Sequence, residues 1–569
     1  EPSEIKPMAT LHDNYHSMSP VQRLFKLLEN FKSEIKEIYL FALLNSLVSL
    51  SLPLGLQAII QYLITGQPSS SLYLIMAVIV LATVLNGWMN IHQLNISEHV
   101  RQMLFVRGAF DFVHRIPRLD LQRLVRGYVP EMMNRFFDVV AIQSSLQKAL
   151  MDFSTAFFQM IFGLLLLSFY HPIFIALTLI LLLLFYFVIV LLGKKALYYS
   201  IKESGHKYKV VFWLEEMARL STTIRLLPSL EPGIRKMDAE VDAYLEDRNA
   251  HYRILKIQYW GLVIMKLLVI GSLMALGIIL LQKQQINLAQ FVAAEIVVLL
   301  IISSLEKIIF QMDSIYDLIT SVTKVAHVAD LPLKEASTVA PEQRSEIKAK
   351  GPLSLSLSNL SFKYDDSTQW KFRDLNLQVQ AGQKICISGR GGSGKNTLLK
   401  LLTGIYSASQ GQLLIDQKPL EWIDRLTLNK RLGHCLNTEG VFEETLYNNI
   451  DLGSGCTADQ IMQACNEVGL KSYLEHLEEG VFTPLQSEGS PLSATAAKRV
   501  VLARSLVHQP GLMIYEDVFT SLTQDEKAEL YRTLTNQPWT LVAFSNDPLL
   551  QQACDLRYEL INGQITRLS

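Results

Sequence analysis

The N-terminal half of the chain carries six long apolar stretches, which constrain the fold more than any other feature of the sequence. They lie near residues 38–65, 72–96, 150–170, 173–193, 260–282 and 288–312. Each is long enough for the ~20 residues with which an α-helix crosses the hydrocarbon core of a bilayer. The composition agrees, because 50% of the residues are hydrophobic, only 18% are charged and the mean hydropathy is +0.23. We therefore expect a membrane protein with six transmembrane helices embedded in a lipid bilayer.

The distribution of Lys and Arg predicts how these helices are oriented. The connections at 66–71 and 170–172 contain neither residue, and the one at 282–287 contains only Lys283. The connection between the second and third stretches is basic and contains Arg101, Arg107, Arg115, Arg118, Arg123, Arg126 and Arg135. The positive-inside rule therefore places the two long connections and both ends of the chain in the cytoplasm. Because these connections have a helical pattern, we expect the second to fifth helices to continue beyond the membrane.

The sequence divides into four parts. Residues 1–36 form an N-terminal segment in which apolar residues recur at helical spacing; a helix along the inner membrane surface and a plain surface helix both fit this pattern. Residues 37–330 form the six-helix region and 331–352 a polar linker. Residues 353–569 alternate strand and helix patterns, as an α/β domain does. The formal charge of −1 argues against a nucleic-acid partner.

Charged residues inside the apolar stretches are rare and therefore informative. Asp152, Lys266, Glu306 and Lys307 lie near the predicted cytoplasmic helix ends, where they can form pairs or reach the interface. Glu295 lies further inside the sixth stretch. Either it lines a substrate path, or it is a carboxylate satisfied by a neighbouring helix.

A glycine-rich segment, GRGGSGKNT, follows a strand-like run at Lys384–Ser388 and precedes a helix-like run. In this context glycines let backbone N–H groups surround a polyphosphate, the helix N-terminus adds its dipole, and a lysine reaches the outer phosphates. The residues expected at the phosphates are Gly389, Gly391, Gly392, Ser393, Gly394, Lys395, Asn396 and Thr397. Asn396 departs from the pattern, because this position normally supplies a Ser or Thr hydroxyl to Mg²⁺.

The whole chain resembles a half-transporter of the ABC exporter family. The membrane part, including EMMNRFFDV at Glu131–Val139, is most similar to type I secretion exporters, and the C-terminal part carries the family's motifs in order. The resemblance implies a bacterial inner-membrane exporter whose cytoplasmic nucleotide-binding domain binds ATP and Mg²⁺. It also implies a dimer with a second half, either the same chain or a different one. A secretion-like assembly would add a periplasmic adaptor and an outer-membrane channel.

The resemblance assigns roles to further residues. Tyr364 falls where the family stacks an aromatic ring on adenine. In LSATA, at Leu492–Ala496, Ser493 is kept, but both glycines of the family's LSGGQ signature are replaced. Asn437 stands where the family has a glutamine beside the γ-phosphate, and Asn546 stands where it has a switch histidine.

Two carboxylates carry the remaining family roles. Glu516 and Asp517 stand where the family has Asp-Glu. The first acid helps to hold Mg²⁺, together with the residue at Asn437, and the second activates the attacking water. Since these side-chain lengths are exchanged and the signature is also altered, the resemblance implies weakened Mg²⁺ binding and impaired or absent hydrolysis. The chain is then either an exporter half or a non-catalytic regulatory or structural subunit of a larger envelope complex.

Overall fold

The structure is a computed structural model of the chain and describes residues 18–64, 70–124, 128–334, 346–365 and 367–568. Contacts divide the chain into two compact units. The helical unit comprises Glu1–Leu119 and Gly127–Leu331. The α/β unit comprises Pro332–Ser569 together with a short segment from the first long connection, Asp120–Arg126.

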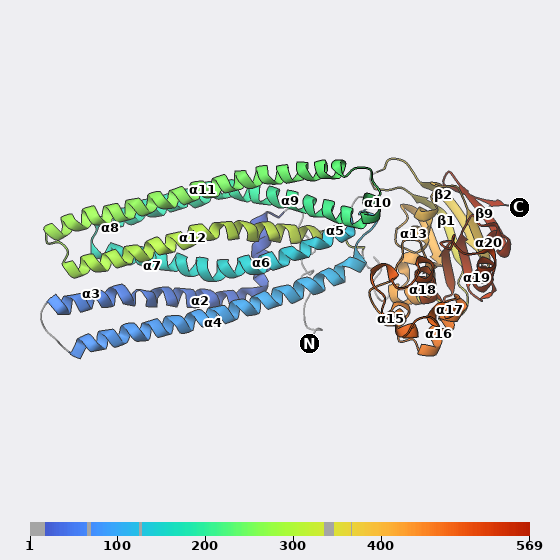
Figure 1. Ribbon diagram of the computed structural model, residues 1–569, viewed down its shortest axis with the longest axis horizontal. Coiled ribbons are helices and arrows are strands. Elements are labelled where there is room, and N and C mark those ends of the chain that lie inside the picture. Colours follow the sequence, from blue (N-terminus) through green and yellow to red (C-terminus); the bar gives the residue numbers. More distant parts are fainter. Residues whose placement is uncertain (1–17, 65–69, 125–127, 335–345, 366, 569) are drawn as a thin grey trace. The chain divides into compact units, whose positions relative to one another are not determined.

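Six long helical segments lie side by side in the helical unit (Figure 1), and they confirm the six predicted transmembrane helices. They span Pro20–Ile64, Ser70–Arg118, Val129–Tyr170, Ile173–Arg219, Glu231–Gln282 and Leu288–Ala329, with 42 to 52 residues each. At 1.5 Å per residue, only about 20 residues are needed to cross a bilayer. Each segment is therefore long enough to continue well beyond the hydrocarbon core, as predicted for the second to fifth helices. The protein is an integral membrane protein.

Three of these segments contain more than one α-helix. The helices are α1 (Pro20–Leu28), α2 (Lys32–Ser49), α3 (Ser51–Ile64), α4 (Ser70–Arg115), α5 (Val129–Met133), α6 (Phe137–Lys148), α7 (Ser154–Tyr170), α8 (Ile173–Tyr186), α9 (Leu192–Arg219), α10 (Ser221–Arg225), α11 (Glu231–Gln282) and α12 (Leu288–Ala329). The first and last of these helices begin with a capping box, formed by Ser19 with Gln22 and by Asn287 with Gln290. Such caps satisfy N–H groups that a helix start leaves unpaired.

Burial differs strongly among the helices of this unit. In the most apolar 18-residue stretch of α12, half of the residues are buried. In the corresponding stretch of the segment that begins with α4, 6% are buried. Large apolar side chains of the outer helices face outward; Leu81, Leu183 and Leu267 are 68%, 70% and 72% exposed. Such surfaces suit contact with lipid. Of the charges predicted to be structural, Lys266 and Glu306 form an ion pair, and Asp152 accepts a hydrogen bond from Gln311 at 3.3 Å.

The α/β unit contains two β-sheets. Their strands are β1 (Leu355–Phe362), β2 (Phe372–Val379), β3 (Lys384–Ser388), β4 (Gln410–Ile415), β5 (Lys418–Pro419), β6 (Leu432–Cys435), β7 (Leu512–Glu516), β8 (Thr540–Phe544), β9 (Leu556–Ile561) and β10 (Gln564–Leu568). One sheet is antiparallel, with the order β2-β1-β4-β5. The other has the order β10-β9-β3-β8-β7-β6 and is parallel except for β10. The predicted α/β fold is thus confirmed.

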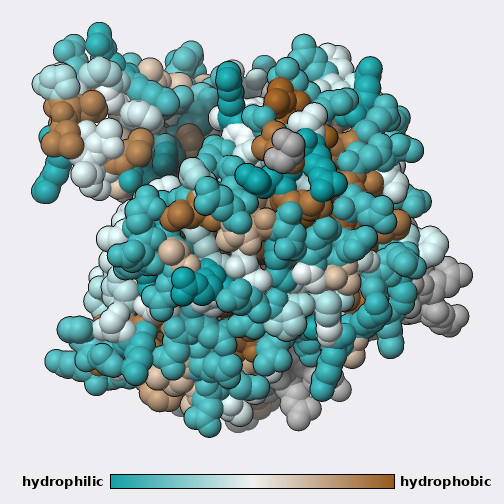
Figure 2. All heavy atoms as spheres, turned by 90° about the vertical axis from the view of Figure 1, so that its right-hand side faces the viewer, coloured by the Kyte–Doolittle hydropathy of each residue, from teal (hydrophilic) through white to brown (hydrophobic). Residues whose placement is uncertain are grey.

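Helices pack on both faces of the parallel sheet. The helices of this unit are α13 (Lys395–Leu402), α14 (Arg425–Arg431), α15 (Leu446–Asp451), α16 (Ala458–Glu467), α17 (Lys471–Leu474), α18 (Ala494–Leu506), α19 (Gln524–Asn536) and α20 (Pro548–Ala553). Alternate residues of β7 enter two different apolar cores: Met513 and Tyr515 pack with α18 and α19, whereas Leu512 and Ile514 pack with α13. The exterior differs from these apolar cores, because the face seen in Figure 2 is mainly hydrophilic with small hydrophobic groups.

This sheet order brings three strand ends together. β3 pairs with β8, and β8 pairs with β7, all in parallel. The carboxyl ends of β3, β7 and β8 therefore lie next to one another, which is where α/β proteins bind ligands. The glycine-rich loop follows β3, Asp517 follows β7, and Asn546 lies two residues after β8.

A segment of the first long connection belongs to the α/β unit by its contacts. The N–H of Asp120 donates to the carbonyl of Pro332 at 2.9 Å, and the N–H of Ser407 donates to the side chain of Gln122 at 3.0 Å. In the sequence, this segment lies just before the motif EMMNRFFDV, which carries part of the resemblance to type I secretion exporters.

Candidate nucleotide-binding site

The glycine-rich loop joins the end of β3 to the start of α13, as the sequence predicts. Gly392 and Gly394 have positive φ angles of 80° and 113°. A Cβ at Gly394 would lie 2.9 Å from Cε of Lys371 and 3.0 Å from the ring of Phe372. Backbone conformation and close packing therefore both require glycine at this position.

Two side chains of the loop are poised for an anion. The ammonium of Lys395 donates to the carbonyls of Gly389 and Arg390, the latter at 3.2 Å. Burial lowers the pKa of Lys395, while the charge of Glu516 opposes this shift. The hydroxyl of Ser393 is buried and has no hydrogen-bond partner among the described residues. A phosphate oxygen would satisfy this hydroxyl and draw the ammonium away from the carbonyls.

Tyr364, the expected adenine platform, is held by its own neighbours. Its hydroxyl shares a hydrogen bond with Thr397 at 2.7 Å. Its ring makes near-perpendicular contacts with Phe362 and Tyr406, at centroid distances of 5.1 and 6.2 Å. The structure thus brings Tyr364 to the predicted loop residue Thr397, but through its hydroxyl.

The two carboxylates after β7 have different surroundings. Glu516 accepts a hydrogen bond from the backbone N–H of Asn437 at 2.8 Å. Asp517 accepts hydrogen bonds from Ser545 at 2.6 Å and from Tyr531 at 3.2 Å. Hydroxyl groups therefore engage both oxygens of Asp517. Burial, together with the charge of Asp517, raises the pKa of Tyr531 far above its usual value, so this hydroxyl stays a donor.

Asn546 contacts the glycine-rich loop directly. Its side-chain oxygen accepts a hydrogen bond from the N–H of Gly389 at 3.0 Å. The structure thus joins the predicted switch position to the start of the phosphate loop. The amide has no charge to offer a phosphate, in contrast to a protonated histidine.

The other predicted site residues lie elsewhere. Ser493 caps α18, and its hydroxyl accepts from the N–H of Ala496 at 3.2 Å. Glu295 lies on α12 of the helical unit, is half-buried and forms no hydrogen bond or ion pair with any described residue. Sequence reasoning missed Ser545 and Tyr531. Only Ser545 had a signal, since it directly precedes Asn546.

Magnesium would find oxygen ligands here. Glu516, Asn437 and Asn396 carry carboxylate or amide oxygens, the donor type that Mg²⁺ prefers. The described residues contain no group of three or more His, Cys, Asp or Glu side chains that could hold a metal. A bound Mg²⁺ would therefore depend on nucleotide phosphates for several of its ligands, and it would neutralise their charge.

Comparisons with known proteins agree with this geometry. Residues 37–305 match the ABC transporter transmembrane region, and residues 372–520 match the ABC transporter domain. The chain belongs to the ABC transporter family. The ABC transporter domain implies ATP binding, usually with Mg²⁺.

Individual relatives are exporters. A leukotoxin export ATP-binding protein (LtxB) of Aggregatibacter actinomycetemcomitans is 30% identical over 210 residues, 36% of this chain and 29% of the relative. An ATP-dependent lipid A-core flippase of Syntrophus aciditrophicus is 29% identical over 181 residues, 32% of this chain and 30% of the relative. This ABC transporter chain thus aligns with less than a third of the length of these relatives.

A solved structure shares the fold over nearly the whole ABC transporter chain. It is a bacterial Atm1-family ABC exporter with ATP bound, with a TM-score of 0.78 and 16% identity. The match covers 95% of this chain and 94% of the other. At this identity the similarity establishes the exporter fold alone.

Proposed function

We propose that this chain is one half of a dimeric bacterial ABC exporter that binds ATP, hydrolyses it slowly or not at all, and moves a substrate across the inner membrane. Its α/β unit lies in the cytoplasm, consistent with the basic inner connections. The second half is another copy or a different ABC chain. In a secretion-like assembly, a periplasmic adaptor and an outer-membrane channel would complete the path.

The surroundings of Asp517 carry the proposal of impaired hydrolysis. This residue stands where an ABC transporter activates the attacking water, and its side chain is one methylene shorter than the usual glutamate. Hydroxyls of Ser545 and Tyr531 occupy its oxygens. A general base must reach the proton that it abstracts, and its loss costs about 10²–10⁴-fold in rate. The carboxylate is thus too short and too strongly engaged to serve as an efficient base.

Glu516 differs from the usual residue in the opposite direction, because its side chain is longer than the usual metal-binding aspartate. It accepts a hydrogen bond from the N–H of Asn437. A displacement of about 1 Å can lower a rate by roughly a hundredfold. Together with Asn396 after the loop lysine, this exchange favours weakened Mg²⁺ binding.

Magnesium-dependent ATP turnover in lipid nanodiscs tests the proposal, with ATP binding measured on the same samples. We expect binding without brisk turnover, and loss of binding in Lys395→Ala. Restoring the usual order with the double variant Glu516→Asp/Asp517→Glu should raise turnover. Asp459→Asn is the matched control, since Asp459 is exposed on α16. Brisk wild-type turnover that Lys395→Ala abolishes would contradict the proposal.

A non-catalytic regulatory or structural subunit is the second candidate. The altered signature favours it, because in a dimer the glycine-rich loop and the two carboxylates would serve one composite site and LSATA the other. Even a standard partner would then leave both sites incomplete. Co-expression with candidate partner halves separates the two functions when ATP turnover and substrate movement are both measured. An exporter half supports substrate movement, whereas a regulatory subunit alters only the ATP turnover of its partner.

Glu295 belongs to the substrate path in this proposal. The alternative, a carboxylate satisfied by a neighbouring helix, finds no partner for it among the described residues. Uptake of hydrophobic fluorescent compounds into inside-out vesicles tests the role. Glu295→Gln should change uptake without lowering the melting temperature. Unchanged uptake in Glu295→Gln, with only destabilisation in Glu295→Leu, would assign the residue a structural role.

A further inference from the structure

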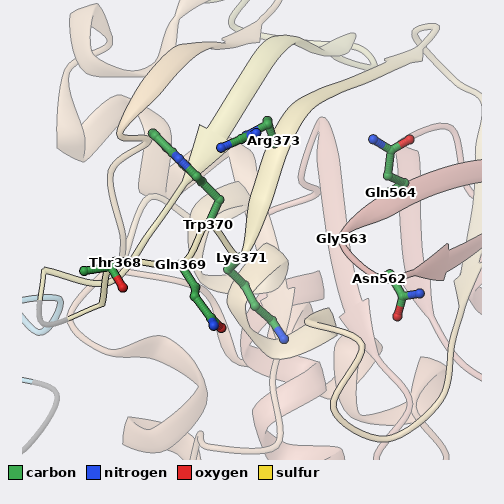
Figure 3. A pocket seen from close by; sticks show the side chains of 8 residues that line it. All are labelled: Thr368, Gln369, Trp370, Lys371, Arg373, Asn562, Gly563 and Gln564. Atoms are coloured by element: carbon green, nitrogen blue, oxygen red, sulfur yellow. The ribbon is translucent and has the colours of Figure 1, made fainter.

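A group of basic side chains on the helical unit takes no part in the candidate nucleotide-binding site. In the α/β unit, Lys371 and Arg373 line the pocket shown in Figure 3. The ammonium of Lys371 donates to the carbonyl of Gly392 in the glycine-rich loop at 2.8 Å, so that pocket belongs to the nucleotide site. On the helical unit, four exposed cations lie on α9 and α11, namely Lys194, Lys195, Arg253 and Lys256. These four residues are called the α9/α11 basic cluster.

The α9/α11 basic cluster lies at the boundary of the membrane spans. Lys194 and Lys195 directly follow the apolar stretch 173–193, and Arg253 and Lys256 precede the apolar stretch 260–282. Both pairs are thus placed where their helices leave the hydrocarbon core, on the side of the long connections.

Contacts on either side of the cluster show how the two helices face each other. They lie side by side (Figure 1). The ammonium of Lys202 is 2.9 Å from the carboxylate of Asp247. Further along, a Cβ at Gly261 would lie 2.9 Å from a methyl group of Val188. The chains therefore run antiparallel, and residues 194–198 lie level with residues 251–256.

The cations share the outer face of this helix pair with two aromatic rings. On α11, Arg253, Lys256 and Trp260 recur at helical spacing and are exposed, whereas the intervening His251, Ile254, Leu255 and Gln258 are buried. On α9, Tyr198 is exposed with the two lysines, whereas Ala196 and Ser200 are buried. Tyr and Trp side chains are enriched at membrane–water interfaces.

Acidic partners are missing from the cluster but present further along the same helices. Lys202 pairs with Asp247 at 2.9 Å, and Arg248 pairs with Glu203 at 3.3 Å. The cluster residues form no ion pair with any described residue. Residues 192–202 and 248–282 contain neither Asp nor Glu. The positive-inside rule accounts for basic residues in this connection, but not for unpaired cations gathered on one face of two helices.

The exposed surface next to the cluster, on the membrane side, is apolar. It includes Phe187, Leu191, Ile264 and Leu267. From the membrane outward, the face therefore presents aliphatic side chains, aromatic rings and cations. A phospholipid presents acyl chains, ester groups and a phosphate in the same order. A soluble anion would match only the cations and leave the apolar part of the face unmatched.

We propose that the α9/α11 basic cluster binds the headgroup of an anionic phospholipid in the leaflet on the side of the long connections. Basic pockets between transmembrane helices bind such headgroups by charge. The lipid joins α9 to α11 where both leave the bilayer, while its acyl chains cover the apolar part of the face.

Tryptophan quenching in lipid nanodiscs tests this proposal on the full chain. The bulk lipid is phosphatidylcholine, and a varied fraction of either phosphatidylglycerol or phosphatidylcholine carries bromine on its acyl chains. Bromine quenches a tryptophan that it contacts, and the difference between the chain and Trp260→Phe isolates Trp260, which is 61% exposed. We expect brominated phosphatidylglycerol to quench Trp260 at a lower fraction than brominated phosphatidylcholine does.

Charge removal identifies the residues that bind the lipid. Lys195→Gln/Arg253→Gln should weaken the relative affinity for phosphatidylglycerol about 30-fold, the equivalent of ~1 kcal/mol for each charge removed. Lys195→Arg/Arg253→Lys should retain the affinity, because both charges remain. Lys209→Gln/Arg235→Gln is the matched control, since it removes the same charge from exposed positions on α9 and α11, further from the apolar stretches. The control should bind phosphatidylglycerol as the wild type does.

Several outcomes would overturn the assignment. Equal weakening in the two Gln double variants would show attraction to the leaflet as a whole. Competition by excess glycerol phosphate would show a site for soluble anions. A Trp260 that neither brominated lipid quenches would show that the face is covered, as by a second half of the exporter. The experiment contains no nucleotide, so its result leaves the proposed ATP binding and weak hydrolysis to be judged separately.

Discussion

The carboxyl end of β3 and the neighbouring ends of β7 and β8 lie in one sheet but differ in chemistry. The β3 loop has positive-φ glycines, a lysine and a buried hydroxyl without a described partner. After β7 and β8, the polar side chains are engaged with one another: Asp517 with Ser545 and Tyr531. A ligand at Ser393 and Lys395 breaks no hydrogen bond between side chains, whereas Asp517 must give up hydrogen bonds from two side chains to act on one. Binding and hydrolysis therefore make separable demands on this fold.

The largest effect on stability is expected at the β3 loop. Gly394→Ala places a Cβ 2.9 Å from Lys371 and at φ 113°, where L-residues are strained. Left-handed strain and overpacking together predict a loss of about 2–4 kcal/mol in the free energy of unfolding. Thermal unfolding in nanodiscs measures it.

Gly391→Ala provides the comparison for this variant. A Cβ at Gly391 would meet no atom within 4 Å. Its unfolding should differ from wild type by less than about 0.5 kcal/mol. Equal losses in the two variants would show that the loop conformation differs from the one described.

A smaller effect is expected beyond β7. Tyr531→Phe removes the hydroxyl that donates to both oxygens of Asp517 at 3.2 Å. Hydrogen bonds to charged groups contribute about 1.5–3 kcal/mol to stability. Because Ser545 stays as a donor, we expect Tyr531→Phe to lower the free energy of unfolding by about 1–2 kcal/mol. Tyr558→Phe is the control, since the Tyr558 hydroxyl has no described hydrogen-bond partner. A melting temperature unchanged by Tyr531→Phe would mean that this hydroxyl does not hold Asp517.

The same contrast separates what sequence could predict from what it could not. The six spans and the β3 loop depend on local patterns, so their positions were predictable. Tyr531 lies on α19 and Ser545 follows β8. Their meeting with Asp517 depends on strand order and helix packing, which no local pattern encodes.

The smallest effect on the nucleotide-free protein is expected at Lys395. Because burial lowers its pKa, protonation of Lys395 costs the folded state stability. That cost is fully present below the folded-state pKa and disappears as the pH rises past the unfolded value. Lys395→Met removes the charge, so the melting temperature at pH 7 should not fall. Any gain over wild type should shrink as the pH approaches the ordinary lysine value.

Without nucleotide, Lys395→Met should be at least as stable as wild type; with ATP, it should be the less stable of the two. A ligand that binds only the folded state raises the melting temperature, and at a given concentration a tighter ligand raises it more. ATP in EDTA should stabilise wild type but not Lys395→Met, because the ammonium that reaches the phosphates is gone. Lys471→Met, at an exposed position on α17, should keep the full response to ATP. A destabilised nucleotide-free Lys395→Met protein would show that the ammonium holds the loop together through the carbonyls of Gly389 and Arg390, and the β3 loop would then resemble the self-engaged region beyond β7.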